Sequence, residues 1–219
     1  MYTHATLPTP VRMIPLAVLI FVILIGGLVA QLMLGLELPQ PSPNPPLAQP
    51  VPLLETVSPL FTPEVRYWND SIVRWAKDYD LDPNLVATVM QIESCGNPEA
   101  VSSSNAQGLF QVMPFHFVEG ENMRDPDTNA KRGLAYLSKG LALSGDQAGL
   151  ALAGYNGGHS QIAKAWSRWP NETQRYFYWG SGIYAEANAG ADSSSRLAEW
   201  LKAGGAGMCA RARQQLGLP

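Results

Sequence analysis

A run of 23 residues without a charged side chain, from Ile14 to Leu36, constrains the fold of this chain more than any other feature. A helix of about 20 apolar residues is long enough to cross a bilayer. The run is apolar on every face, whereas a helix that packs on a soluble core keeps a polar face. We therefore expect residues 14–36 to form a transmembrane helix, preceded by a short cytoplasmic tail, residues 1–13.

A cleaved signal peptide is the alternative for this run. Signal peptides have a shorter apolar region and a small-x-small motif at the cleavage point, and the nearest match here, Leu28-Val29-Ala30, is poor. Arg12 precedes the run, and the next basic residue is Arg66. The positive-inside tendency therefore predicts a single-pass protein of the cytoplasmic or inner membrane, with its C-terminal part on the extracytoplasmic side.

The segment after the apolar run is rich in proline, which makes up nine of the 25 residues from Pro39 to Pro63. Proline lacks a backbone donor and favours extended polyproline II structure. We expect residues 37–62 to be a semi-rigid linker that holds a domain away from the membrane.

The remainder of the chain has the pattern of a mainly α protein. Apolar residues recur at intervals of three and four, and no segment alternates as a strand would. We expect a domain over residues 63–187 and a C-terminal helical extension over 188–219. The expected helices cover residues 65–79, 83–93, 127–143, 147–155, 159–166, 172–187 and 195–203, with loops at 102–105 and 154–158.

Composition limits the partners of this domain. The formal net charge is −3, and only 15% of the residues are charged. A nucleic-acid-binding protein carries a strong positive charge on one face, and nothing here is basic enough to suggest it, so no nucleic acid is expected as a partner.

Glu93 stands out because it occupies a position where the helical pattern predicts an apolar residue. Asp82-Pro83 is typical of a helix start, and Gly96 of a helix end. Glu93 then lies at the C-terminal end of the helix, beside apolar side chains. Desolvation and the negative end of the helix dipole both favour the protonated carboxyl, which is the state a general acid needs.

The residues around and after Glu93 match four sequence blocks in order. They are Glu93-Ser94, Ala106 to Pro114 (AQGLFQVMP), Gly154 to Gly158 (GYNGG), and Glu172-Thr173-x-x-Tyr176. Over about residues 64–187 the chain resembles the lytic transglycosylases of the soluble-lytic-transglycosylase (SLT) domain family. The resemblance implies a lysozyme-like α fold with a substrate cleft, and peptidoglycan glycan strands as the partner.

The resemblance also implies a mechanism and roles for single residues. Glu93 would act as both acid and base, cutting the bond between N-acetylmuramic acid and N-acetylglucosamine to leave a 1,6-anhydro ring. Tyr176 would donate its hydroxyl to Glu93 or to the sugar. The residues expected to bind substrate are Ser94, Gln111, Met113, Tyr155 and Asn156.

Two other functions remain open at this point. A lysozyme-type hydrolase on the same fold would need a second carboxylate to activate water. The acidic residues that follow Glu93 lie in polar, loop-like segments and are better interpreted as solvated groups or helix caps: Glu99, Glu119, Glu121, Asp125 and Asp127. A non-catalytic wall-binding module is the other alternative, which the presence of Glu93 and Tyr176 disfavours.

No metal or cofactor is expected. The three histidines, His4, His116 and His159, lie far apart and lack the spacing of a zinc site. The glycines of residues 154–158 are not followed by the Lys-Ser/Thr of a phosphate-binding loop.

The chain has two cysteines, Cys95 and Cys209, both after the apolar run. Outside the cytoplasm, two cysteines in one domain pair more often than they stay free. We expect a disulfide that supports the turn after Glu93; two separate buried thiols are the alternative.

Overall fold

The computed structural model describes residues 56–219. The tail expected at 1–13, the transmembrane helix expected at 14–36 and most of the linker expected at 37–62 lie outside these residues. Within residues 56–219, no helix combines the length and the apolar character that crossing a membrane requires.

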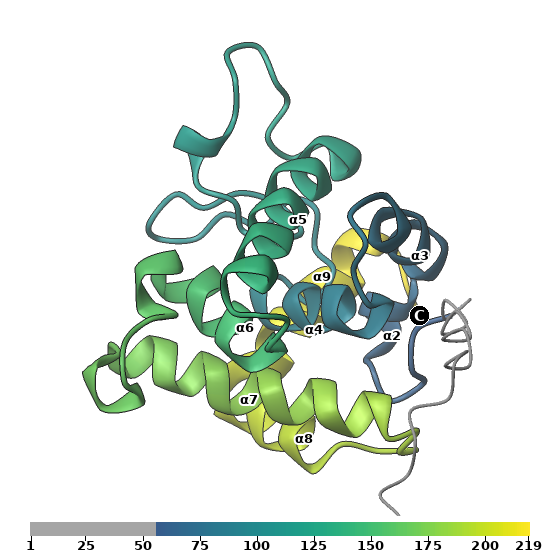
Figure 1. Cartoon of the computed structure of the whole chain (residues 1–219). Helices are drawn as coiled ribbons and strands as arrows, with labels where there is room; N and C mark the ends of the chain where they lie inside the picture. The colour runs from purple at the N-terminus through teal and green to yellow at the C-terminus, as the bar shows by residue number, and fades with distance from the viewer. Residues whose placement is uncertain (1–55) are drawn as a thin grey trace, which may run out of the picture. The chain divides into compact units, whose positions relative to one another are not determined.

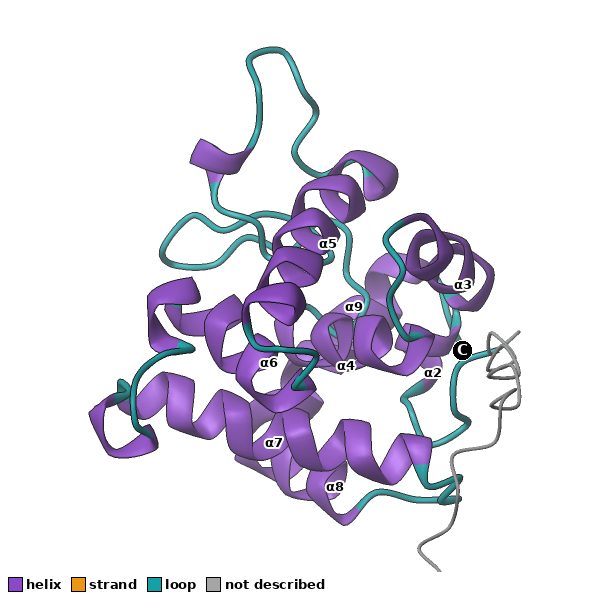
Figure 2. Ribbon diagram, in the orientation of Figure 1, coloured by secondary structure: helices purple, strands orange, loops and turns teal. Residues whose placement is uncertain are grey.

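The described part of the chain is helical, as expected, and contains two isolated β-bridges but no strand (Figure 2). The α-helices are α2 (Pro63–Arg66), α3 (Asn69–Asp78), α4 (Pro83–Glu93), α5 (Pro126–Leu143), α6 (Ala148–Gly157), α7 (Asn171–Asn188), α8 (Ser195–Trp200) and α9 (Ala206–Leu216). The 3-10 helical segments are η1 (Pro114–His116), η2 (His159–Gln161) and η3 (Trp166–Arg168), and η4 (Leu201–Gly205) is a π-helical segment.

Helix α4 lies in the middle of the domain, with α2 and α3 on one side and α7 on another (Figure 1). Its start is the one expected: the Asp82 carboxylate accepts a hydrogen bond from the Asn84 amide at 2.7 Å, and Pro83 occupies the first turn. Every residue from Pro83 to Ile92 is buried. The expectation of one apolar stripe on this helix was therefore too narrow, because neighbours cover it on all sides.

The remaining helices form a continuous series around α4. Helix α5 packs on α6, α6 on α7, and α7 on both α4 and α8 (Figure 1). In α5, Ala130, Leu134 and Leu137 are fully buried, and Leu141 is partly buried against the same core, as their spacing predicts.

Three expected segments differ in the structure. The helix expected over 65–79 is divided into α2 and α3, because Trp68 leaves the helical conformation and its indole N–H donates to the Gly96 carbonyl at 2.8 Å. The helix expected over 159–166 is replaced by the short turns η2 and η3. The loop expected over 154–158 is largely the last turn of α6, where Gly154 and Gly157 allow Ile162 and Thr173 to approach the helix closely.

The core extends beyond both expected ends of the globular domain. Val57, Leu60 and Phe61, which the proline pattern assigned to the linker, are buried in it. At the other end Cys209 and Ala212 of α9 belong to the same core. Residues 188–219 are therefore integral to the packing of the domain.

Candidate active site

Glu93 is the last residue of α4, and the chain turns sharply after it. Cys95 and Gly96 both adopt positive φ angles, 53° and 82°. A Cβ at Gly96 would lie 2.6 Å from the Glu64 carbonyl oxygen, so this turn packs directly on α2. The turn fixes where the Glu93 side chain leaves the core.

The Glu93 carboxyl is enclosed by protein atoms but keeps part of its surface open to a cavity. Burial raises its pKa from the ordinary 4.5 to about 8. A donor from Tyr176 lowers this pKa, and the charge of Glu172 raises it. The carboxyl is therefore protonated at neutral pH, as the sequence led us to expect.

Tyr176 of α7 is 5% exposed, and its hydroxyl is buried without a hydrogen bond of regular geometry. The hydroxyl nevertheless lies near enough to Glu93 to influence its pKa. Because no regular hydrogen bond forms, we interpret the pair as a close contact in poor geometry. Burial, together with the negative charge that Glu93 carries once it ionises, holds the pKa of Tyr176 well above its usual range, so this hydroxyl is a donor at neutral pH.

The cavity beside Glu93 has a volume of about 340 Å³, and α4, the loop before η1, α6, α7 and α9 contribute to its wall. Its lining residues are Ile92, Glu93, Ser102, Gln111, Asn156, Glu172, Arg175, Tyr176, Trp179 and Met208.

A second cavity of about 290 Å³ adjoins the first, since Gln111 and Asn156 line both. Met113 and Tyr155 lie in its wall. The two cavities together form a groove that passes Glu93, and four of the five residues expected to bind substrate line it.

The loop that carries Gln111 and Met113 is fixed by hydrogen bonds that are buried or partly buried. Asn129 of α5 accepts from the Phe110 amide at 2.8 Å and donates to the Gln107 carbonyl at 2.8 Å. Tyr155 of α6 donates its hydroxyl to the Phe110 carbonyl at 2.7 Å. These contacts hold one wall of the groove against two helices.

Ser94 does not have the position expected of a substrate-binding residue. It is fully buried, donates its hydroxyl to the Leu109 carbonyl at 2.7 Å and accepts from the Gly96 amide at 3.1 Å. Because its hydrogen bonds are used inside the protein, Ser94 holds the turn after Glu93 to the loop that precedes Gln111.

The structure adds residues to the cavity that the sequence had not singled out for a role. Glu172 and Trp179 lie on the same face of α7 as Tyr176, at the helical spacing of four and three residues, which a helical projection could have found. Ser102 comes from a segment expected only as a loop. Met208 lies outside the matched blocks, so no sequence signal indicated it.

The five acidic residues considered as partners of Glu93 lie outside both cavities. Asp125 caps α5 through the Thr128 amide, as expected of a helix cap. Three of the others form ion pairs with arginines: Glu99 with Arg124, Glu121 with Arg132, and Asp127 with Arg74. The second carboxylate in the Glu93 cavity is Glu172.

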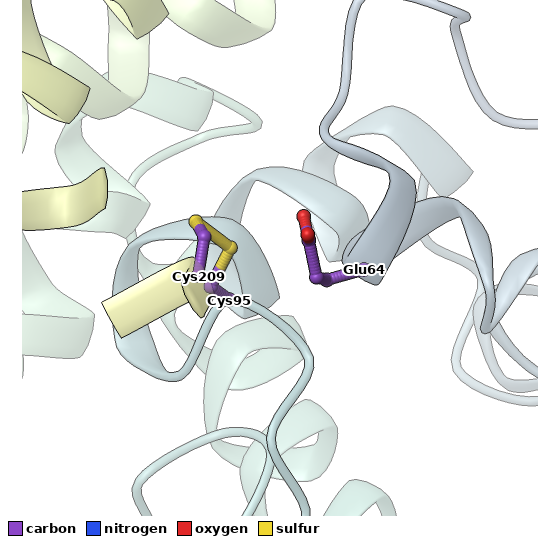
Figure 3. A group of neighbouring side chains, drawn as sticks. All are labelled: Glu64, Cys95 and Cys209. Atoms are coloured by element: carbon purple, nitrogen blue, oxygen red, sulfur yellow. A yellow bond between two sulfur atoms is a disulfide. The ribbon is translucent and has the colours of Figure 1, made fainter. Parts of the chain in front are cut away.

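The structure contains the expected disulfide between Cys95 and Cys209, with 5.0 Å between their Cα atoms. Glu64 lies beside it (Figure 3), and the carboxylate oxygen and the two sulfurs are within 4.8 Å of one another. Thiol ligands bind metals as thiolates, and these sulfurs are bonded to each other. In this oxidised form the group does not provide a metal site.

Residues 70–177 match the family model described as the transglycosylase SLT domain. This segment of the chain is a transglycosylase SLT domain. A transglycosylase of Enterobacteria phage PRD1 is 38% identical over 111 residues, which is 50% of this chain and 40% of the phage protein. Membrane-bound lytic murein transglycosylase E of Buchnera aphidicola subsp. Acyrthosiphon pisum is 36% identical over 87 residues, 34% of this chain and 39% of that protein.

The chain thus spans about two fifths of the length of these relatives. Among solved structures, an inactive mutant of the lytic transglycosylase Slt from Pseudomonas aeruginosa aligns with a TM-score of 0.41 at 21% identity, over 68% of this chain and 24% of that one.

Proposed function

We propose that this protein is a peptidoglycan lytic transglycosylase with a lysozyme-like fold. It cleaves the β-1,4 bond between N-acetylmuramic acid and N-acetylglucosamine without water. The observation that carries the proposal is Glu93: a carboxyl with a pKa of about 8, open to a groove, within an SLT domain. The names of the relatives, which include a lytic murein transglycosylase, support the same substrate class.

In the first step Glu93 gives its proton to the glycosidic oxygen, and the bond from that oxygen to C1 of the muramic acid breaks. An acid whose pKa lies near the working pH is suited to this transfer. The N-acetylglucosamine side leaves as an alcohol, and C1 takes on oxocarbenium character.

In the second step the C6 hydroxyl of the same sugar attacks C1, and the Glu93 carboxylate takes the hydroxyl proton. The 1,6-anhydro ring closes and Glu93 is protonated again, so protons balance over the cycle. An internal nucleophile has the advantage of proximity, and one carboxyl serves both steps. These steps use no metal or cofactor.

The remaining cavity residues support binding and orientation in this proposal. Tyr176 donates to the Glu93 carboxylate once it forms, or to the sugar. In this proposal Gln111 and Asn156, which line both cavities, hydrogen-bond a glycan that extends through the groove. Met113 and Tyr155 form apolar surface in the adjoining cavity.

A hydrolase is the second candidate, because Glu172 lines the same cavity as Glu93. A carboxylate opposite the acid is what an inverting glycosidase uses to activate water. Glu172 is solvent-exposed and lies one helical turn from Tyr176, so it also has a simple role as a surface charge on α7.

Product analysis separates the two candidates. Purified sacculi are digested with the wild-type protein and with Glu172→Gln, and the released muropeptides are identified by mass spectrometry. We expect 1,6-anhydro ends from both proteins, because C6 replaces water as nucleophile. Reducing ends from the wild type, lost in Glu172→Gln, would establish the hydrolase instead.

We further propose that residues 14–36 anchor the protein in the cytoplasmic membrane and that the domain works on the extracytoplasmic side, behind a linker that ends near residue 56. A carbonate wash tests the anchor: the full chain should remain with the membranes. Release of a soluble protein that begins near Ala30 would identify a cleaved signal peptide.

A further inference from the structure

The cavity that contains Glu93 has an apolar part that the proposed chemistry leaves unused. Ile92 of α4, Trp179 of α7 and Met208 of α9 all line it, whereas most of its other residues are polar or charged. A cavity with both kinds of lining fits a ligand with both hydroxyl groups and apolar substituents.

Met208 is the residue of this group that comes from outside the SLT match, which ends at residue 177. It is half-buried and packs on the edge of the core. Its unbranched thioether adapts to the shape of a ligand and gives a polarisable apolar surface.

The position of Met208 is fixed relative to Glu93 by a covalent bond. Cys209 follows Met208 directly, Cys95 follows Glu93 by two residues, and the two cysteines are joined (Figure 3). The Gln91 amide donates to the sulfurs of Cys95 and Cys209 at 3.1 and 3.5 Å. The disulfide thus connects the α9 wall of the cavity to the turn that directs the acid.

One turn further along α9 there is a second attachment. The Arg213 guanidinium donates to the Glu64 carboxylate at 2.6 Å, and Glu64 is 1% exposed. Ala212, between the two attachments, is fully buried. Helix α9 is therefore held along one face, and Met208 lies on the turn that the disulfide fixes.

We propose that Met208 is a specificity-determining residue: with Ile92 and Trp179 it forms an apolar wall that receives a methyl group of the bound glycan, and the Cys95–Cys209 disulfide positions this wall. The inference rests on the proposed function for its substrate class. N-acetylmuramic acid carries methyl groups on its acetamido and lactyl substituents, and an apolar wall discriminates such groups by about tenfold to a hundredfold.

Binding to the full-length protein tests the wall separately from the reaction. In a Glu93→Gln background, Met208→Ala should weaken the binding of muramic-acid-containing glycan fragments about 3- to 10-fold. Met208→Leu should stay within about twofold, because it keeps the apolar volume. The matched control is Met123→Ala, since Met123 is also half-buried and lines neither cavity.

Measuring the same variants with a chitin oligosaccharide, which has acetamido but no lactyl groups, shows which methyl group of the glycan contacts the wall. A larger loss with the muramyl ligand assigns the lactyl group, and equal losses assign the acetamido group; both support the wall. Equal affinities of Met208→Ala and Met123→Ala would overturn it. Failure of the proposed function would give a different result, since the wild-type protein would then release no 1,6-anhydro products.

The positioning role of the disulfide is tested in the same background. Cys95→Ser with Cys209→Ser, or reduction of the protein with its cysteines intact, should weaken binding about as much as Met208→Ala does. Adding Met208→Ala to the two serine substitutions should then weaken binding by less than about a further twofold, because both changes disrupt the same wall. Fully additive losses, with near-UV circular dichroism showing folded protein, would overturn the positioning role.

Discussion

Glu93 combines two conditions that seldom occur together in one side chain, enclosure by the core and access to a ligand. Burial alone would raise its pKa and leave it inert, and exposure alone would leave it ionised at neutral pH. The turn at Cys95 and Gly96 provides both, because α4 ends where the groove begins.

The pKa of Glu93 predicts how activity depends on pH. The acid must be protonated, so kcat/KM should fall as pH rises through about 8, the pKa in the folded protein. Glu93→Gln should lose at least 99% of the activity at every pH, because an amide cannot transfer the proton. Activity above about 1% would place the acid elsewhere.

The same group predicts a pH-dependent difference in stability. Its folded pKa is raised above the ordinary 4.5, so its contribution to stability is fully present below about pH 4.5 and is lost as pH rises through about 8. Glu93→Gln lacks this titration. The gap in unfolding free energy between Glu93→Gln and wild type should therefore widen from pH 4 to pH 9, by up to about 5 kcal/mol. A constant gap in denaturant titrations would contradict the raised pKa.

Tyr176→Phe separates a catalytic hydroxyl from a structural one. The hydroxyl is buried without a regular hydrogen-bond partner, so removing it should leave the melting temperature unchanged or higher. Activity should fall about 10- to 100-fold, and the alkaline limb of the pH profile should move upward, because Tyr176 lowers the pKa of Glu93. A lower melting temperature with unchanged kcat would make the residue structural.

At the scale of single residues the sequence predicted the position of Glu93 at the end of a buried helix, because a helix start, an apolar pattern and a helix end are all local. Ser94 shows the limit. Whether its hydroxyl faces the groove or the Leu109 carbonyl depends on a contact across 15 residues of chain, which no local pattern contains.

Among the elements, the end of α4 is the most demanding part of the fold. Gly96 has a φ of +82°, and a Cβ there would lie 2.6 Å from a backbone oxygen of α2. Any other residue at this position would be strained by the left-handed conformation, and its Cβ would also displace α2.

Two glycine substitutions separate these costs. Gly190 has a φ of +70° with open space around it, so Gly190→Ala should cost only the conformational term, about 1–2 kcal/mol. Gly96→Ala should cost more and should also reduce activity, since the turn directs Glu93. Denaturant unfolding measures the loss of stability, and a lysis assay measures the loss of activity. An equal loss of unfolding free energy in Gly96→Ala and Gly190→Ala would show that α2 moves to accommodate the new side chain at little cost.

Helices with a clear apolar pattern, such as α4 and α5, were predicted from the sequence to within one residue. Helix α9 was expected only as part of a helical extension over 188–219, without bounds of its own, because its stretch from Ala206 to Leu216 has few large apolar residues and is held by Cys209, Ala212 and Arg213. The end of α6 was interpreted as a loop, since its glycines serve close packing there rather than a turn.

For the whole molecule, the disulfide closes a loop of 114 residue steps that contains most of the SLT domain. On the chain-entropy model such a loop is worth about 4–5 kcal/mol. Cys209→Ser should lower the melting temperature markedly, and the unfolded, unreduced wild type should contain no titratable thiol. Two titratable thiols per chain would show that the bond does not form.

The packing of α2 against α9 makes the first and last helices of residues 56–219 neighbours, and Figure 1 marks the C-terminus beside α2. The backbone therefore follows a nearly closed circuit. A domain whose ends adjoin can be spliced into a host protein, or have its ends joined and new ones opened in a surface loop, without crossing its own groove. The exposed segment at Glu119 and Gly120, outside both cavities, is the natural place for such new ends.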